Sequence, residues 1–208
     1  MGHHHHHHPK HRFDPSHAAR LLDPARRGIE DPHALVQEIG IKPGMALVDL
    51  GCGAGFFTPA LLQTVGAEGS VTAVELQPEV LAFFRGHVGT PPNLQDCCAD
   101  LTQTGLPAAH YDAVFIAFTL HEVTVAEALV EIKRLLKPGG VLVALDWGVF
   151  GPCPERADGK KMGPPEDHRL LLDTLRGLLQ AAGLVEEAAG ERLGGCQYWL
   201  RAHKPMEV

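Results

Sequence analysis

The sequence predicts an α/β fold: a doubly wound sheet of seven strands, mostly parallel with the last strand antiparallel, inside a three-layer αβα sandwich. Short apolar runs alternate along the chain with segments of helical period. Most of these runs are apolar throughout, which is typical of parallel strands covered on both faces. Near the C-terminus, the short sequence RLGG separates two further runs and favours an antiparallel hairpin.

Each element follows from a local pattern. Strands are expected at residues 46–50, 70–75, 94–98, 111–118, 141–147, 185–192 and 196–203, and helices at residues 58–65, 78–87, 125–136 and 166–182. The helix at 125–136 places Leu129, Ile132 and Leu135 on one stripe. It is expected to end at the sequence KPGG, because proline and paired glycines do not continue a helix.

The chain divides into a tag, a cap and one domain. Residues 1–8 are interpreted as an expression tag and excluded from fold reasoning. Residues 9–40 are expected to form an N-terminal helical cap, because Asp14 and Asp31 each precede a proline at helix N-cap and N1 positions. Residues 41–208 form the domain, and its Pro- and Gly-rich stretch 148–166 is expected to be a long loop that acts as a lid.

Composition narrows the classes of partner. The formal net charge is -7, which argues against nucleic acid, since phosphate binding needs clustered Lys and Arg. No apolar run approaches the roughly 20 residues that a membrane span needs. No secretory signal is recognisable, so we expect a cytoplasmic protein. The oligomeric state is left open.

The cysteines do not indicate a disulfide framework. Cys52, Cys97, Cys98, Cys153 and Cys196 are odd in number and lack C-x-x-C spacing, so neither a disulfide nor a zinc site is predicted, and no metal is expected. The adjacent pair Cys97 and Cys98 is open to interpretation as a soft-metal or redox site. We expect these two to be buried strand residues, because reduced cysteine behaves as a small hydrophobe.

The stretch VDLGCGAGFF carries the main functional signal. Gly51, Gly53 and Gly55 follow an apolar run and precede a helix, where ligands of doubly wound sheets bind. Their spacing is G-x-G-x-G, and Phe56 occupies a place where a dinucleotide fingerprint tends toward glycine. Asp49 lies just ahead of the glycines, and a carboxylate there suits a cationic ligand better than a diphosphate.

Two further acids follow neighbouring strands. Glu75 closes the second strand about 20 residues on, where a ribose diol needs an acceptor. Asp100 follows the third strand and is placed to accept from an exocyclic amine. Together these residues describe a nucleoside with a positive or zwitterionic tail and no phosphate. S-adenosylmethionine fits that description.

At this point the chain resembles the class I S-adenosylmethionine-dependent methyltransferases, which have a Rossmann-like fold. VDLGCGAG resembles motif I, Glu75 the motif II acid and CADL the adenine-contacting stretch. YDAVFIAFTLHEV resembles motif IV with its continuation, and LKPGGVLVALDW is similar to the turn into strand five. The match spans about half of the chain. It is most similar to small-molecule enzymes of the quinone-biosynthesis type.

The resemblance implies a role for each site residue. It assigns the cofactor site to Asp49, Gly51, Cys52, Gly53, Gly55, Glu75, Leu76, Asp100, Leu101 and Phe118. The glycines lie under the methionine and ribose, Asp49 binds the amino end and Glu75 the ribose hydroxyls. Leu76 packs on the adenine, Asp100 contacts its amine and Leu101 offers a backbone N–H. The product is S-adenosylhomocysteine.

His121 is the candidate general base. It follows the fourth strand at the mouth of the expected site, and a hydroxyl or amine acceptor must lose a proton during in-line methyl transfer. A structural histidine is the competing interpretation. Glu122 is a candidate for orienting that imidazole, but we expect it to begin the next helix. Lys160, Lys161, His168 and Arg169 lie near the lid and are candidates for recognising an anionic acceptor, or a solvated loop.

Other functions stay open beside the expected small-molecule methyltransferase. A protein or RNA methyltransferase is one, although AFTL stands where nucleic-acid amino methyltransferases carry a Pro-Pro-Tyr signature. A non-catalytic S-adenosylmethionine-binding protein is another. A nicotinamide dehydrogenase is disfavoured by the glycine spacing. Arsenic methylation is disfavoured because several cysteines are expected to be buried.

Overall fold

The computed structural model describes residues 15–23, 30–155, 159 and 161–206, and the predicted tag lies outside these residues. The elements are η1 (Pro15–Leu22), α2 (Pro32–Glu38), β1 (Ala46–Leu50), α3 (Thr58–Val65), β2 (Ser70–Glu75), α4 (Pro78–Val88), β3 (Leu94–Cys98), β4 (Tyr111–Ala117), η2 (Leu120–Glu122), α5 (Val125–Leu135), β5 (Leu136–Trp147), η3 (Glu166–His168), α6 (Leu172–Ala182), β6 (Val185–Arg192), η4 (Leu193–Gly195) and β7 (Gln197–His203).

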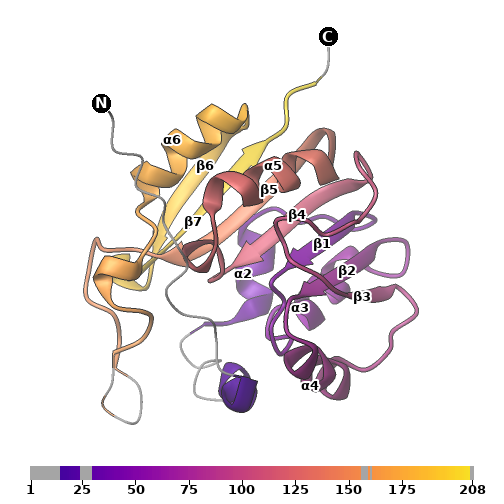
Figure 1. Ribbon diagram of the computed structural model, residues 1–208, viewed down its shortest axis with the longest axis horizontal. Helices are drawn as coiled ribbons and strands as arrows, with labels where there is room; N and C mark the ends of the chain where they lie inside the picture. The colour runs from indigo at the N-terminus through magenta and orange to yellow at the C-terminus, as the bar shows by residue number, and fades with distance from the viewer. Residues whose placement is uncertain (1–14, 24–29, 156–158, 160, 207–208) are drawn as a thin grey trace.

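The strands form one seven-stranded sheet in the order β3-β2-β1-β4-β5-β7-β6 (Figure 1). β1 pairs in parallel with β2 and with β4, and β4 pairs in parallel with β5. β7 is antiparallel to both β5 and β6, as the RLGG turn predicts. The expected fold class is confirmed. The strand order reverses between β1 and β4, and in such a sheet this switch point is where ligands bind.

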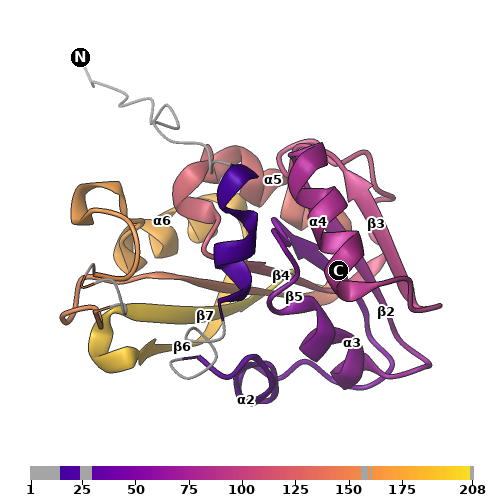
Figure 2. The same ribbon diagram turned by 90° about the horizontal axis from the view of Figure 1, so that it is seen from below.

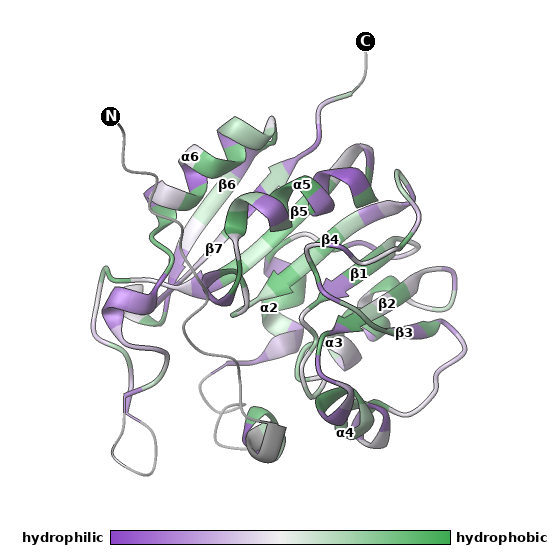
Figure 3. Ribbon diagram, in the orientation of Figure 1, coloured by the Kyte–Doolittle hydropathy of each residue, from purple (hydrophilic) through white to green (hydrophobic). Residues whose placement is uncertain are grey.

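Helices cover both faces of the sheet (Figure 2). On one face, α2 and α3 pack on strand residues such as Leu47 and Phe115. On the other, α5 and α6 pack on residues such as Ile116 and Leu200. Hydrophobic residues follow the central strands β4 and β5, while hydrophobic and hydrophilic residues alternate along α5 and α6 (Figure 3). This double cover explains why the central strands are apolar throughout.

Two boundaries differ from those expected by more than one residue. β5 begins at Leu136, not at residue 141, because KPGG forms an irregular start of the strand: Gly139 has φ +76° and donates its N–H to Lys204. α6 begins at Leu172, not at residue 166. The hydroxyl of Tyr198 donates to the Leu170 carbonyl at 2.9 Å, and residues 169–171 stay extended between η3 and α6.

The expectation that Cys97 and Cys98 are buried was wrong. β3 is an edge strand, and only β2 pairs with it. Cys98 is exposed and Cys97 is half-buried against the core. The short sequence LQDCC has too little apolar surface for a strand covered on both faces.

The described part of the N-terminal segment lies beside the sheet. Asp31 caps α2, accepting the His33 N–H at 2.9 Å, as its Asp-Pro pair predicts, whereas Asp14 lies outside the described residues. η1 packs against α4. Among the described residues, none of the helices combines the length and hydropathy of a membrane span.

Candidate active site

One cavity opens where the carboxyl ends of β1, β2 and β4 meet, and its volume is about 280 Å³. That volume is near the lower end of the range for small-molecule sites. It is lined by Leu21, Asp49, Gly51, Cys52, Gly53, Ala54, Phe56, Phe57, Val74, Glu75, Leu76, Gln77, Val80, Ala99, Asp100, Leu101, Thr102, Ala117, Phe118, Thr119, Glu122, Val123, Thr124 and Glu127. The loops after four strands thus contribute to one site.

The glycine loop forms its floor. Gly51, Gly53 and Gly55 have φ of +72°, +54° and +86°, a region that other residues rarely adopt. A Cβ on Gly51 would lie 2.7 Å from the Thr119 side chain, and one on Gly53 would lie 3.1 Å from Leu21. Gly55 does not line the cavity: a Cβ there would lie 2.5 Å from Val88, so its missing side chain makes room for α4.

Two buried carboxylates stand beside this floor. Asp49 at the end of β1 accepts a hydrogen bond from the Thr58 hydroxyl at 2.7 Å. Burial raises the pKa of Asp49 to about 7; the Thr58 hydrogen bond opposes this and the charge of Glu75 adds to it. Burial also raises the pKa of Glu75, against backbone N–H donors that favour its charged form. The site therefore favours a cationic ligand, which lowers the cost of two adjacent negative charges.

Backbone groups orient Glu75. Its two oxygens accept the N–H groups of Gln77 at 2.9 Å and of Gly53 at 3.2 Å. These bonds tie the end of β2 to the glycine loop. They leave acceptor lone pairs on a carboxylate that faces the cavity, which suits the two hydroxyls of a ribose.

The far end of the cavity holds Leu76, Asp100 and Leu101. Leu76 is 41% exposed, although it is a large apolar side chain, and it lies directly after Glu75. Asp100 accepts both the N–H and the hydroxyl of Thr102 on Oδ1, at 2.8 and 2.7 Å. An apolar surface next to a fixed carboxylate can hold a flat heterocycle that carries an amine.

Aromatic rings form the wall toward β5. Phe118 has φ +55°, an unusual value for a bulky residue and one that is common at functional sites. Its ring centroid is 6.2 Å from that of Phe57 and 4.7 Å from that of Trp147. Phe118 lines the cavity, whereas Trp147 contacts the Phe118 ring without lining the cavity.

His121 lies beside the cavity rather than in its lining. Its Nδ1 is 2.7 Å from Oδ1 of Asp146, and its Nε2 is 3.8 Å from Oε1 of Glu122. Asp146 is fully buried at the end of β5 and also accepts the backbone N–H groups of His121 and Trp147. Contrary to expectation, Glu122 does not begin the next helix: it ends the separate turn η2 and lines the cavity.

The two carboxylates control the charge of the imidazole. Burial lowers the pKa of His121, and Arg169 acts in the same direction, but the hydrogen bond and charge of Asp146 and the charge of Glu122 outweigh both. The net result is a pKa above its ordinary value. Burial raises the pKa of Glu122; His121 opposes this shift, and the charges of Asp146 and Glu75 add to it.

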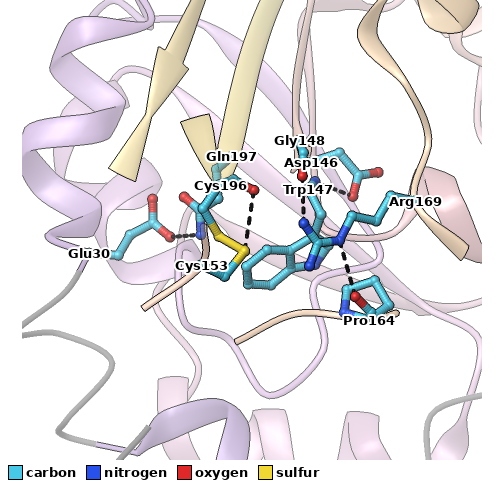
Figure 4. Close-up of a disulfide and its surroundings, with 9 residues drawn as sticks. All are labelled: Glu30, Asp146, Trp147, Gly148, Cys153, Pro164, Arg169, Cys196 and Gln197. Carbon is cyan, nitrogen blue, oxygen red and sulfur yellow. Dashed lines mark hydrogen bonds between the residues drawn. A yellow bond between two sulfur atoms is a disulfide. The ribbon is translucent and has the colours of Figure 1, made fainter. Parts of the chain in front are cut away.

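The expectation that the chain has no disulfide was wrong. Cys153, in the 148–166 stretch, is bonded to Cys196, which directly precedes β7 (Figure 4). The pairing joins residues 43 apart in sequence, so spacing gave no signal for it. Arg169 donates to the carbonyls of Gly148 at 2.6 Å and Pro164 at 3.1 Å, and so closes the base of the same loop.

This loop does not reach the cavity lining in the part that the structure describes. Lys161 pairs with Glu155 across a short antiparallel bridge, and Arg169 is committed to backbone carbonyls. Lys160 lies outside the described residues. Gly163 contacts Trp147, because a Cβ there would lie 2.7 Å from its ring. The loop therefore touches the site through Trp147 and Phe118.

Comparison with known proteins places this geometry in a family. A family model described as a methyltransferase domain matches residues 48–144. A solved S-adenosylmethionine-dependent methyltransferase from Aquifex aeolicus is 31% identical with a TM-score of 0.80, over 92% of this chain and 99% of that one. The chain belongs to the S-adenosylmethionine-dependent methyltransferase family. The resemblance read from the motifs is confirmed, and with it the expected cofactor.

Several curated relatives are named for quinone biosynthesis. The demethylmenaquinone methyltransferase of Staphylococcus aureus is 31% identical over 113 residues, which cover 54% of this chain and 47% of the relative. The ubiquinone/menaquinone biosynthesis C-methyltransferase of Ectopseudomonas mendocina is 35% identical over 116 residues, covering 54% of this chain and 45% of the relative. The chain thus spans about half the length of these methyltransferases.

Most of the residues that the sequence predicts for the cofactor site line this one cavity. The structure brings together Asp49, Gly51, Cys52, Gly53, Glu75, Leu76, Asp100, Leu101 and Phe118, and it leaves Gly55 and His121 outside the lining. Sequence reasoning missed Leu21, Thr119, Glu122 and Asp146. The signal for Asp146 was an acid that ends a strand. In the described part of the chain, no group of three or more His, Cys, Asp or Glu could hold a metal.

Proposed function

We propose that this chain transfers a methyl group from S-adenosylmethionine to a small-molecule acceptor by in-line displacement, with S-adenosylhomocysteine as the product. The observation that carries the proposal is the cavity at the switch point of the sheet, floored by bare peptide groups and walled by acids. When bound, S-adenosylmethionine supplies an electrophilic methyl group on a positively charged sulfur. The chain's own residues bind and orient it.

The charge of the cavity fits this cofactor. Asp49, Glu75, Asp100, Glu122 and Glu127 all line it, and no Lys, Arg or His does so among the described residues. A pyrophosphate would meet these carboxylates without a balancing cation, whereas a sulfonium with an ammonium group would be attracted. The set of donors and acceptors therefore supports S-adenosylmethionine over a nicotinamide dinucleotide.

We assign the binding roles by position in the cavity. Gly51 and Gly53 support the methionine and ribose, with Asp49 at the amino end and Glu75 on the ribose hydroxyls. The adenine contacts are assigned to Leu76, Asp100 and the backbone of Leu101. Cys52 fills space. Burial and the charges of Asp49 and Glu75 raise the pKa of the Cys52 thiol, which supports an inert rather than a reactive cysteine.

The acceptor is proposed to be a small molecule. The curated relatives named for demethylmenaquinone and for ubiquinone/menaquinone biosynthesis support a quinol-like compound. We infer that the acceptor approaches past Phe118 and Trp147, with the 148–166 loop as a lid and the residue 9–40 segment as a cap over the cofactor. Leu21, which lines the cavity near Gly53, supports the role of the cap.

His121 is proposed to take part in removing the acceptor's proton. Its hydrogen bond to Asp146 and its position beside the cavity support this role.

The cytoplasm remains our prediction for the location of the protein. Because disulfides are rare in the reducing cytosol, counting free thiols in protein taken directly from cells checks whether the Cys153–Cys196 bond exists there.

A calorimetric titration tests the cofactor assignment. We expect S-adenosylmethionine and S-adenosylhomocysteine to bind the full chain with one-to-one stoichiometry and NAD to give no heat of binding. Tight binding of NAD without binding of either S-adenosyl compound would overturn the proposal. Methyl transfer is then measured as the amount of S-adenosylhomocysteine formed when naphthohydroquinone or catechol is supplied as a probe acceptor.

A further inference from the structure

Two acids lie beside the His121 ring, Glu122 and Asp146, and of these two Glu122 lines the cavity. It ends the turn η2, four residues after Phe118, and its side chain is half-buried. Its carboxylate lies close enough to Glu75 and Asp146 for their charges to raise its pKa. Glu122 therefore lies near both the carboxylate that we assign to the ribose and Asp146 at the end of β5.

His121 stands behind Glu122 in a fixed orientation. The fully buried Asp146 accepts from the backbone N–H of His121 at 3.2 Å and lies 2.7 Å from Nδ1. Asp146 also accepts the backbone N–H of Trp147, so three hydrogen bonds hold its carboxylate. Nδ1 then carries a proton toward Asp146, and Nε2 is left facing Glu122.

His121 does not line the cavity, and the charges around it favour the imidazolium over the neutral base. Asp146 on β5 and Glu122 on η2 favour the imidazolium, while Arg169, which follows η3, opposes it. An imidazolium has no lone pair to accept a proton. Burial and two neighbouring carboxylates raise the pKa of Glu122, which makes its carboxylate a stronger base than an ordinary glutamate.

We propose that Glu122 faces the reacting methyl group and is the catalytic residue that accepts the acceptor's proton, with His121 and Asp146 as positioning residues. This inference rests on the proposed function. The acceptor atom forms a bond to the methyl carbon as the carbon–sulfur bond breaks, and that electron pair stays on sulfur. The acceptor's proton passes to the Glu122 carboxylate.

The proposal also defines the class of acceptor. Its nucleophile arrives with a proton, as a hydroxyl, a protonated amine or an acidic C–H group does. A carboxylate or phosphate next to the reacting atom is disfavoured, because every charged side chain that lines the cavity in the described residues is an acid. Arg169, a candidate for binding an anionic acceptor, instead holds the Gly148 and Pro164 carbonyls.

A comparison of two ligands tests the position of Glu122 without a known acceptor. S-adenosylmethionine differs from S-adenosylhomocysteine by the methyl group and the positive charge on sulfur. Calorimetry of both ligands gives an affinity ratio for the wild type, Glu122→Gln and Glu122→Asp. We expect Glu122→Gln to lower the preference for S-adenosylmethionine about tenfold, and Glu122→Asp to lower it less. The matched control is Glu68→Gln. It removes an exposed acid from the loop before β2, at the end of the strands away from the cavity, and should leave the ratio at the wild-type value.

The pH dependence of the same ratio tests His121. The imidazolium lowers the pKa of Glu122, so His121→Asn should move the pH midpoint of the preference upward. That shift should disappear in the Glu122→Gln background, which a purely structural role of His121 would not produce.

The outcomes separate this inference from the proposed function. A wild type that binds neither ligand refutes the proposed function. A wild type that binds both, with a Glu122→Gln variant of unchanged ratio, refutes only the role of Glu122. An upward shift that persists in the double variant refutes the role of His121 as a residue that acts through Glu122.

Discussion

The part of the molecule built on β1, β2 and β3 and the part built on β5, β7 and β6 are held together by different kinds of contact. In the first, β1 and β2 each lead through a loop into a helix and β3 leads through a loop to β4, and most of the residues that line the cavity lie at the ends of these strands and in the loops that follow them. In the second, key contacts join distant segments: Cys153 to Cys196, Arg169 to Gly148 and Tyr198 to Leu170. The first part binds the cofactor in our proposal, and the second faces the acceptor. Local motifs therefore reveal the cofactor site, whereas the acceptor side depends on tertiary structure.

The largest expected effect is a loss of stability from a change in the part built on β5, β7 and β6. Cys153→Ser removes the cross-link that fastens the 148–166 loop to β7. Closure of a loop of this length predicts a loss of about 4 kcal/mol in the free energy of unfolding, since the cross-link restricts the unfolded chain. Denaturant unfolding in the absence of reductant measures it. Cys98→Ser, which changes an exposed free thiol, is the control and should leave stability unaltered.

The same variant also tests whether the two parts are independent. The disulfide lies outside the cavity lining, so S-adenosylhomocysteine affinity should stay within about twofold of the wild type at temperatures where the variant is folded. Loss of cofactor binding by folded Cys153→Ser protein would show that the two parts are coupled.

The next effect breaks the first part. Gly51→Ala places a Cβ 2.7 Å from Thr119 at a φ of +72°, so the floor of the cavity must shift. Overpacking of about 1–3 kcal/mol predicts a roughly tenfold to hundredfold loss of S-adenosylhomocysteine affinity, measured by calorimetry. Gly44→Ala is the matched control, because Gly44 has φ +81° but open space around it. Equal affinities in the two variants would contradict the role of Gly51 in the floor of the cavity.

A smaller effect sharpens the electrostatic side of the comparison. The pKa of Asp49 is about 7, so its carboxyl is largely protonated below that pH and charged above it. A cation favours the charged form, and its binding therefore releases a proton. S-adenosylmethionine affinity should rise about tenfold between pH 6 and pH 8, and the affinity for S-adenosylhomocysteine should rise less. Calorimetry in buffers of different ionisation enthalpy detects the released proton, and Asp49→Asn should abolish this step.

The smallest expected effect concerns the junction of the two parts. Asp146→Asn removes the negative charge that favours the His121 imidazolium, so the pKa of His121 should fall. A titration of the ring resonances by NMR measures the change. Asp96→Asn, which removes the partner of Arg85 at the β3 edge, should leave the His121 titration unaltered. A His121 pKa that does not respond to Asp146→Asn would contradict the charge assignment.

The limits of prediction from sequence follow the same division. The alternation of apolar runs with helical segments predicted the strand and helix order, because each unit is stabilised by its own residues and their immediate neighbours. The Gly51 loop and Glu75 were located for the same reason. The bond between Cys153 and Cys196 was missed because nothing local marks it, and Glu122 because its role depends on where η2 turns.

Edges and junctions were the other source of error. β3 was expected to be covered like the central strands, but an edge strand packs on one neighbour and leaves Cys98 exposed. The start of α6 was placed too early, because the hydrogen bonds of Arg169 and Leu170 to distant residues keep the preceding segment extended. Local helix propensity has no information about such partners.

The position of Leu21 has a kinetic consequence. This side chain comes from the N-terminal segment, yet it lines the cavity and lies beside Gly53. A ligand on the glycine loop would therefore contact η1, which packs on α4. We expect removal of η1 to speed both the arrival and the departure of the nucleoside, measured as its association and dissociation rates.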